Sequence, residues 1–316
     1  MSIEHLHHPT IKLLCGNGLD LSSQAARARS AWLPGREGRP PVLLVVLLWA
    51  RECTDVVRTL EAYLDGLLAD FCSTPAGWSE AQAVRQVLAG FNQQLFRQRQ
   101  AGRSIAQLNA GLLLLQNGEA QFLQAGAIGL RRYQGSTVSS MVGRDGFQLG
   151  MQAELALVQH HLHLSADELL LMAPQPLLDV ADMQGWHGLD PNLDTQALQA
   201  LLTPLLQAPG AAVLLRPGGV EQAPVMTVRA AWPAVPHAQP GVQLDGWVLL
   251  SACPYGLPGR LFRATDPRGR EALLWLAEQA ADEAFWQREW ALRRSPVSSL
   301  PQVLSSHQPR EHAFVL

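Results

Sequence analysis

Lysine is almost absent from this chain. Lys12 is the only lysine among the 316 residues, so all other strongly basic side chains are arginines. This excludes a phosphate-binding loop of the G-x-x-x-x-G-K type, because such a loop needs a lysine behind its glycines. The G-x-S-x-G turn that carries the serine nucleophile of many hydrolases is missing as well.

Net charge, long apolar runs and paired cysteines are also scarce. A formal net charge of -3 gives no reason to expect a nucleic acid or an anionic membrane surface as a partner. The longest apolar run, residues 41–50, is about half of the roughly 20 residues that cross a bilayer. The opening residues MSIEHLHHPT lack the basic and apolar regions of a signal peptide, and the four cysteines form no C-x-x-C pair. We therefore expect a cytoplasmic globular protein that binds neither nucleic acid nor membrane.

The sequence patterns predict helices first and short strands afterwards. Continuous Val and Leu over 42–48 indicate a strand buried on both faces. Apolar residues repeat with a helical period over 54–71, and Ser79 with Gln82 forms a capping box that opens a second helix. Further strands are expected on both sides of an Asn117-Gly118 hairpin turn and a tight turn at Gln134-Gly135, within 154–164 and 168–173, and at 224–232, with a helix over 195–207. This order is typical of an α+β fold rather than an alternating parallel one.

Two short stretches could carry chemistry. Residues 169–180, "LLLMAPQPLLDV", predict a buried strand that runs into a broken turn, where two prolines flank Gln175. Many α/β enzymes place catalytic groups where a strand ends, but this strand end carries a glutamine. His160, His161 and His163 form an H-H-x-H cluster, in which the last two would share one strand face and could bind a metal ion. No acid or cysteine lies at ligand spacing beside them, and we favour a solvated strand face.

Several stretches together resemble one known family. They are "STPAGWSEAQAVRQVLAGFNQQLFRQ", "AGLLLLQNGEAQFLQAGAIGLRRYQGSTVSSM" and "QLGMQAELALVQHHLHLSADELLLMAPQPLLDV". They resemble, in order, the asparagine-bearing helix, the central hairpin and the last core strand of the type 2C (PPM) metal-dependent protein phosphatases. The relevant members are bacterial ones fused to a C-terminal kinase domain. The resemblance implies a four-layer α-β-β-α sandwich over most of residues 10–230.

The resemblance also implies a site that this chain has lost. The family holds two divalent cations with aspartates, and the cations activate a bridging water. Leu48, Ala127 and Gln175 stand where three of these aspartates are expected. The early acidic pair of the family falls within residues 24–30, which hold no acid, and the last ligand falls near Glu221. The metal site is therefore expected to be degenerate, with no metal and no cofactor bound.

The tail "LDGWVLLSACPYGLPGRLFRATDPRGREALLWLAEQAADEAFWQREWALRR" resembles the start of a protein-kinase N-lobe. Trp275 stands where the kinase lysine is expected, and Glu289 stands where its helix glutamate is expected. An independent small β-rich module is the other interpretation. Trp286 and Trp290 would be contact residues if they were exposed, although most tryptophans are expected in the core.

These patterns predict a phosphatase-like domain at 1–232, a Pro-rich linker at 233–242, and a truncated N-lobe-like module at 243–316. The expected function is that of an inactive pseudophosphatase and pseudokinase remnant. It would regulate or scaffold through protein contacts, with an active phosphatase or kinase homologue or its phosphoprotein target as partner. One alternative is a phosphatase with a rebuilt site that uses Glu221 and the histidine cluster. Another is a small-ligand or phosphopeptide-binding module that uses Arg131 and Arg132.

Overall fold

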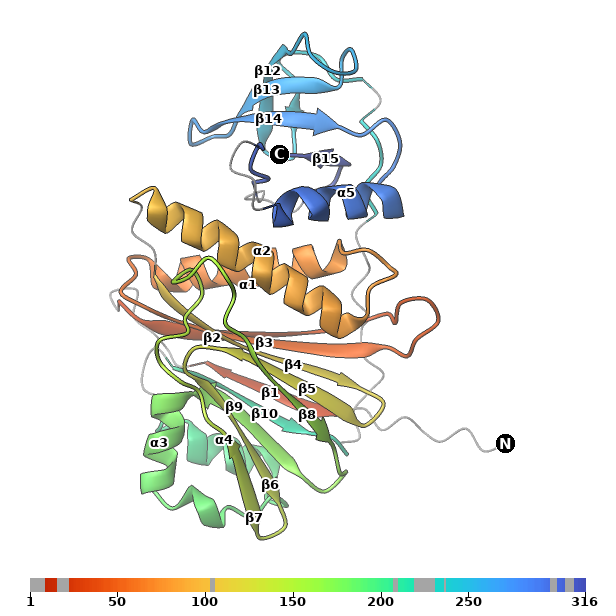
Figure 1. Ribbon diagram of the computed structural model, residues 1–316. Helices are drawn as coiled ribbons and strands as arrows, with labels where there is room; N and C mark the ends of the chain where they lie inside the picture. The colour runs from red at the N-terminus through yellow and green to blue at the C-terminus, as the bar shows by residue number, and fades with distance from the viewer. Residues whose placement is uncertain are drawn as a thin grey trace. The chain divides into compact units, whose positions relative to one another are not determined.

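Every strand ladder in the described part of the chain is antiparallel. The computed structural model describes residues 9–15, 23–102, 106–206, 210–218, 231–235, 237–295, 300–304 and 310–316, without the side chain of His187. These residues divide into unit 1, Met1–Leu64 with Phe91–Thr227, and unit 2, Asp65–Gly90 with Val228–Leu316. The structure is thus a mixed fold of helices and antiparallel sheets, as an α+β chain predicts (Figure 1).

Unit 1 contains two five-stranded sheets. The first has the order β2-β3-β4-β5-β8, with β2 at Ala25–Leu33, β3 at Val42–Arg51, β4 at Gln107–Gln116, β5 at Glu119–Ala125 and β8 at Val158–His163. The second has the order β1-β10-β9-β6-β7, with β1 at Thr10–Cys15, β10 at Ala211–Arg216, β9 at Leu169–Pro174, β6 at Ile128–Gln134 and β7 at Thr137–Met141.

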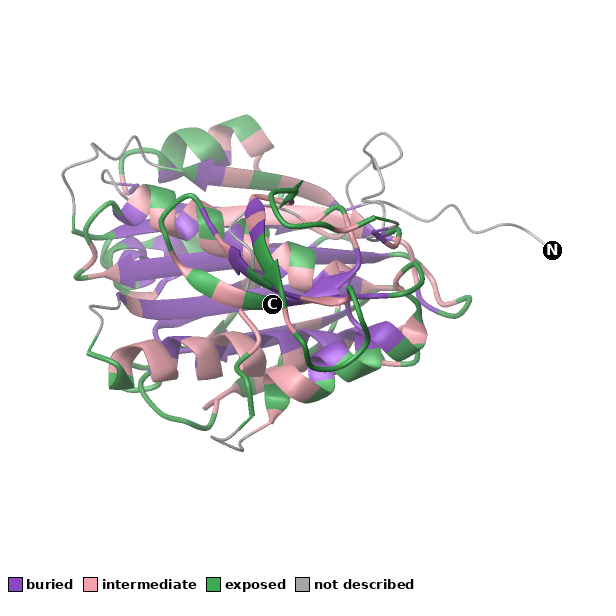
Figure 2. Cartoon of the chain, turned by 90° about the horizontal axis from the view of Figure 1, so that it is seen from above, coloured by how far each residue is buried: buried purple, intermediate pink, exposed green. Residues whose placement is uncertain are grey.

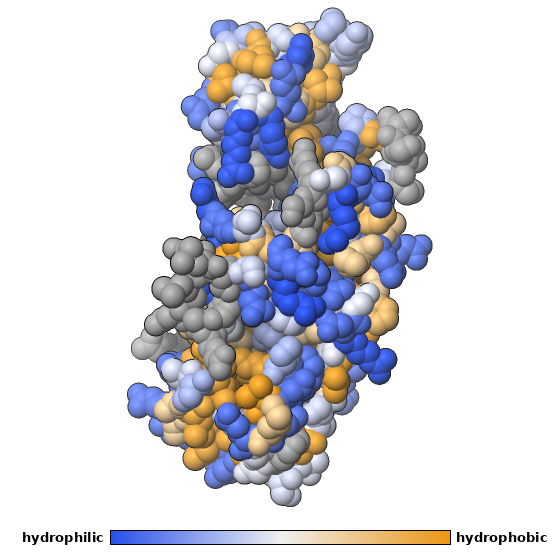
Figure 3. Space-filling view, turned by 90° about the vertical axis from the view of Figure 1, so that its left-hand side faces the viewer, coloured by the Kyte–Doolittle hydropathy of each residue, from blue (hydrophilic) through white to orange (hydrophobic). Residues whose placement is uncertain are grey.

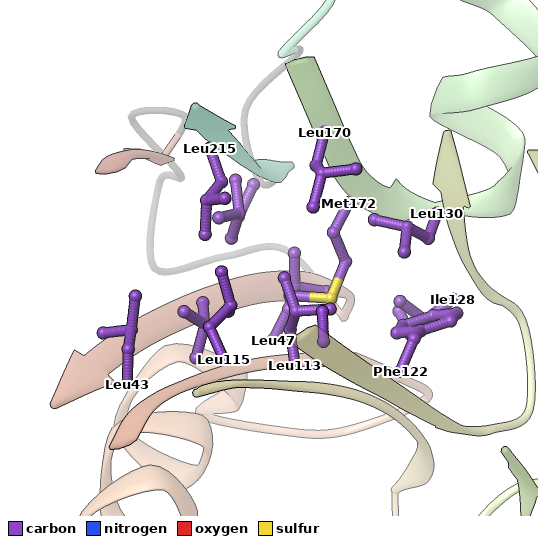
Figure 4. Close-up of a cluster of buried hydrophobic side chains, with 14 of the residues drawn as sticks. Leu43, Leu47, Leu113, Leu115, Phe122, Ile128, Leu130, Leu170, Met172 and Leu215 are labelled. Carbon is purple, nitrogen blue, oxygen red and sulfur yellow. The ribbon is translucent and has the colours of Figure 1, made fainter. Parts of the chain in front are cut away.

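The two sheets pack face to face over one apolar core. Figure 4 shows leucines of β3 and β4 pointing toward side chains of β6, β9 and β10. Burial follows the strands, and nine of the ten residues of β3 are buried (Figure 2). The outer face of β3 is therefore covered too, so the continuous apolar run at 42–48 did predict a strand buried on both faces.

Helices cover the outer surfaces of the sheets. Helix α1 (Val56–Cys72) is tied to β2 through ion pairs of Arg27 and Arg29 with Glu61. Helix α2 (Glu80–Gln100) begins where the hydroxyl of Ser79 accepts a hydrogen bond from the backbone N–H of Gln82, as expected for a cap. On the second sheet, α3 (Gln175–Met183), a short 3-10 turn (Trp186–Gly188) and α4 (Thr195–Leu202) bury a second apolar cluster.

The predicted turns are confirmed, whereas two segments differ from the predictions. Asn117 and Gly118 both have positive φ, the geometry of a two-residue hairpin between β4 and β5, and Gly135 turns the chain between β6 and β7. Strands β1 and β2 lie in the first 40 residues, where no strand was predicted. The broken turn expected at 173–176 is wrong, because α3 begins at Gln175. Pro176 fits its first turn, where a backbone N–H has no helical partner.

Unit 2 contains a third five-stranded sheet and helix α5 (Glu283–Arg294), which begins at an Asp282 cap. The strands are β11 (Gln243–Leu244), β12 (Trp247–Ala252), β13 (Leu261–Thr265), β14 (Glu271–Leu276) and β15 (Phe314–Val315). Most of the strand predicted at 224–232 lies outside the described residues. Trp232 and Val235 are buried in unit 2, around the start of the predicted linker.

The segment 65–90 completes unit 2. The indole N–H of Trp290 donates to the carbonyl of Ser73 at 3.2 Å, and the N–H of Ala76 donates to Glu283 at 2.7 Å. Trp286 and Trp290 are buried, so they are not exposed contact residues. Among the described helices, none combines the length and the apolar character that crossing a membrane requires.

One buried asparagine ties helix α2 to the loop that follows β7. The amide group of Asn92 donates to the carbonyls of Gln152 and Ala153, and its oxygen accepts from the N–H of Gly150 at 2.8 Å. Gly150 has a positive φ, and a Cβ there would lie 2.6 Å from Leu95. The loop can therefore approach the helix closely only with glycine at this position.

We predict that Asn92→Ala lowers the free energy of unfolding by about 1–3 kcal/mol, because it leaves the buried N–H of Gly150 without its acceptor. Urea unfolding followed by circular dichroism measures the change. Gln93→Ala, at the half-buried next position, should stay within about 0.5 kcal/mol of the parent. Equal losses in the two variants would contradict this role for Asn92.

Candidate functional site

Two of the three expected metal-site positions meet at the start of α3. The backbone N–H of Gln175 donates to the carbonyl of Ala127 at 2.9 Å. The side-chain oxygen of Gln175 accepts from the N–H of Gly143 at 3.0 Å, and its amide group donates to Asp179 at 2.7 Å. Ala127 belongs to the core between the sheets. Both polar ends of Gln175 therefore hold the local structure.

At the third expected position, Trp49 and not Leu48 belongs to the core that contains Ala127. Side chains alternate along a strand, and Leu47 and Trp49 belong to the core between the sheets. Leu48 therefore faces the other side of the sheet, away from Ala127 and Gln175. An offset of one residue turns a strand side chain to the opposite face, so the assignment of this position to Leu48 stays a prediction. The guanidinium of Arg51 lies 4.8 Å from the ring centre of Trp49.

Asn109 links these elements, and the sequence argument did not single it out. Its amide group donates to the carbonyl of Trp49 at 3.2 Å, and its oxygen accepts from the N–H of Ala127 at 2.9 Å. Its exposed fraction is 0%. A Cβ on Gly126 would lie 2.2 Å from that oxygen, so glycine is needed where the chain passes from β5 to β6. A lone asparagine within an otherwise apolar strand was the available signal, because buried polar groups need partners.

A pocket of about 320 Å³ opens beside this junction. The described side chains that line it are apolar or neutral amides, and none of these carries a charge. They are Gln24, Trp49, Pro174, Pro176, Leu177, Val180, Gln184, Pro204 and Leu205, with the backbone of Gly210. Magnesium and manganese prefer several hard oxygen ligands, usually with carboxylates among them. This lining supplies only two side-chain amide oxygens.

The other expected metal ligands are not gathered here. Residues 24–30 lie in or next to β2, where Arg27 and Arg29 pair with Glu61. Glu221 lies outside the described residues. Across the described ranges, no group of three or more His, Cys, Asp or Glu side chains could hold a metal ion.

The histidine cluster lies on β8, at the edge of the first sheet. His161 and His163 are exposed, and His163 lies 3.6 Å from the carboxylate of Glu119. The ring of His160 stacks on Phe122 with centres 6.1 Å apart. The structure brings no third ligand to His161 and His163 among the described residues.

Arg131 and Arg132 are engaged within unit 1. Arg131 is buried and binds Asp182 and the carbonyl of Leu178, while Arg132 binds the buried Glu168. The hypothesis that both arginines bind a phosphopeptide is therefore wrong for this arrangement, because their charges are already paired with acids.

Comparisons with known proteins agree with this arrangement of sheets. No family model matches the sequence, and no curated protein matches it in sequence. Solved structures do match. PppA of Pseudomonas aeruginosa has 18% identity and a TM-score of 0.50, over 67% of this chain and 98% of its own. The serine/threonine phosphatase of S. agalactiae has 11% identity and a TM-score of 0.51, over 68% and 100%. A bacterial serine phosphatase has 12% identity and a TM-score of 0.53, over 68% and 100%.

The fold is that of the PP2C-type serine/threonine phosphatases. At these identities the likeness shows the fold alone. It covers about two thirds of the chain. The activity of the PP2C-type enzymes does not follow from the fold, because activity resides in the site.

Unit 2 has a smaller pocket of about 210 Å³. It is lined by Leu257, Trp275, Ala277, Glu278, Gln279, Ala280, Asp282, Ala284, Phe285 and Arg288. The ring of Trp275 stacks on Phe285 with centres 6.5 Å apart, and the guanidinium of Arg288 lies 5.0 Å from its centre. The indole of Trp275 is thus packed against an aromatic ring and a guanidinium.

Glu289 is fully buried and bound by two arginines. Its carboxylate lies 2.7 Å from Arg310 and 2.8 Å from Arg293, and Arg293 also binds Asp70 at 3.1 Å. Burial acts to raise the pKa of Glu289, but Arg310 and Arg293 together lower it below the ordinary value. Burial raises the pKa of Asp70, and Arg293 offsets this only in part.

We predict that Asn109→Ala weakens the junction under the pocket by about 1–3 kcal/mol, because the N–H of Ala127 loses its acceptor. Hydrogen exchange followed by NMR should show faster exchange at the amide of Ala127. Gln107→Ala on the same strand should leave that amide protected. Unchanged protection in Asn109→Ala would rule out this role for Asn109.

We predict that Glu289→Gln destabilises unit 2 by about 3–5 kcal/mol at neutral pH, because two buried arginines lose their acid. The folded-state pKa of Glu289 is lowered, so its stabilising effect is present above the unfolded pKa and is lost as the pH falls through the folded pKa. The difference in the free energy of unfolding between parent and variant, measured by urea unfolding, should therefore become smaller in acid. The exposed Glu278→Gln is the control, and a gap independent of pH would refute the pairing.

Proposed function

We propose that this chain is a phosphatase-like regulatory protein without phosphatase activity of its own, which acts through contacts with other proteins. One observation carries the proposal: uncharged side chains stand at the junction where the PP2C-type fold would need carboxylates. Ala127 and Trp49 occupy the junction with Gln175, and the pocket beside them has an uncharged lining.

The donor chemistry supports this proposal. A pair of dications gives up part of its hydration shell only in exchange for other hard oxygen ligands. Gln175 uses its oxygen for Gly143 and its amide group for Asp179, and Asn109 uses both ends for Trp49 and Ala127. The described residues at the junction therefore do not fit the metal pair, and we propose that the chain binds no cofactor.

We further propose that the PP2C-type region is a four-layer α-β-β-α sandwich, and that unit 2 is related to the start of a kinase N-lobe. Support for the second point comes from three successive antiparallel strands followed by a helix. Trp275 at the lysine position and the binding of Glu289 by Arg310 leave the lysine–glutamate pair of a kinase unformed. Such a unit would not transfer phosphate.

The proposed role is regulation in the cytoplasm. The partner would be an active phosphatase or kinase homologue, or its phosphoprotein target. PppA is described as a key regulatory component of T6SS in Pseudomonas aeruginosa. We take from that description only that a protein with this fold can have a regulatory role. The inter-sheet core without carboxylates would let the fold persist as a scaffold, because no cluster of like charges has to be neutralised.

A second candidate function is a phosphatase with a rebuilt site. It would use His161 and His163, which share the exposed face of β8, together with Glu221. We favour the first function because Glu119 is paired with His163 alone, and no group of three or more His, Cys, Asp or Glu side chains among the described residues could hold a metal ion.

We predict that the purified full chain releases no p-nitrophenol from p-nitrophenyl phosphate above the blank when manganese, magnesium or zinc is present. The S. agalactiae phosphatase, assayed in parallel, is the positive control. Hydrolysis by the parent chain that needs manganese and stops in metal-free buffer would overturn the proposed function. Loss of that activity in His161→Ala and His163→Ala would instead establish the rebuilt site.

A further inference from the structure

The pocket of unit 1 continues into one face of helix α3. Pro176, Val180 and Gln184 line the pocket at intervals of four residues, which places them on one side of the helix. Val180 is 38% exposed, and Met183 in the next turn is 79% exposed. Figure 3 looks onto the side where α3 lies in Figure 1, and apolar surface gathers in its lower part.

The segment that forms β9, α3 and α4 carries negative charge, whereas Arg51 lies on the other side of the pocket's Trp49. From Leu169 to Leu215 the sequence holds four aspartates and no lysine, arginine or glutamate. Asp179 lies next to Val180 and is exposed, whereas Asp182 is paired with the buried Arg131. An apolar pocket with an acidic neighbour attracts a basic partner and repels a phosphate group.

The strand that leads from the pocket into α3 has no free edge. Strand β9, which leads into α3, is paired with β10 on one side and with β6 on the other. A partner cannot add a strand there, so it must be recognised through its side chains, as when an amphipathic helix lies in a groove. A volume of about 320 Å³ can take up a large apolar side chain as an anchor.

We propose that this pocket and the exposed face of α3 dock a basic amphipathic helix of a partner protein, with one bulky apolar side chain in the pocket and lysines or arginines toward Asp179. The inference rests on the proposed function and names the class of partner for the same site. It favours a basic partner over a phosphorylated one, because the described lining carries no positive charge.

The test uses the full chain and three fluorescein-labelled 14-residue peptides in fluorescence anisotropy. The first is the designed Leu/Lys helix LKKLLKLLKKLLKL, the second replaces each lysine by glutamate, and the third is a phosphoserine peptide without leucine. We expect binding of the Leu/Lys helix that weakens with added salt, and no binding of the other two. Tighter binding of the phosphoserine peptide, or no binding of the Leu/Lys helix, would overturn the inference.

Matched variants decide whether the peptide uses this pocket. Val180→Lys should weaken binding tenfold or more, because it removes apolar surface and adds a repelling charge. Leu201→Lys makes the same change on α4, at a site that is 47% exposed and outside the pocket lining, and should change binding less than threefold. Asp179→Asn, which keeps an acceptor for Gln175, should weaken binding severalfold.

Equal affinities of Val180→Lys and Leu201→Lys would overturn the assignment, and Met183→Lys replaces Val180→Lys if the latter does not fold. Peptide binding and metal-dependent hydrolysis are separate measurements. Hydrolysis by the parent overturns the proposed function, whereas an inert chain that ignores the Leu/Lys helix overturns only the docking inference.

Discussion

Burial of both faces of strand β3 is the constraint on which the rest of unit 1 depends. One face packs against the second sheet, and the other face is covered as well. The strand therefore carries no charged side chain before Arg51, its last residue. A carboxylate on such a strand would need a metal or a cation to offset its desolvation. Trp49 removes that need and extends the apolar core to the rim of the pocket.

The polar groups that remain at the junction have become structural. Asn109 joins the ends of β3 and β4 to the crossing between β5 and β6, and Gln175 joins that crossing to α3. Each bond lies in a region of low exposure, where a lost partner costs more than the bond itself contributes. The junction is held rigidly by neutral groups, which suits a fixed contact surface better than a reaction that needs charge.

Local patterns predicted much of this structure, and long-range pairings account for the rest. The Asn117-Gly118 hairpin and the strand at 42–48 carry strong local signals. Strand β2 was missed because its alternating Ala and Arg residues have little intrinsic preference for strands. Helix α3 was missed because Pro176 was taken as a breaker, although a first helical turn accepts proline. Leu48 was favoured over Trp49 because a sequence does not fix which face of a strand meets the core. Nothing local connects Glu289 with Arg310, so their contact was beyond the reach of sequence patterns.

Unit 2 includes residues 65–90, which come before most of unit 1 in the sequence. Residues 65–90 leave unit 1 in mid-sequence, pack with residues 228–316, and return. Neither unit is continuous along the polypeptide. Residues 65–90 are synthesised before residues 228–316, so they cannot pack in unit 2 until those later residues have been made. Trp78 and Ser73 can contact Trp290 only after Trp290 itself has been synthesised. A chain shortened at residues 233–242 would therefore leave Ser73 and Ala76 without Trp290 and Glu283, their hydrogen-bond partners in unit 2.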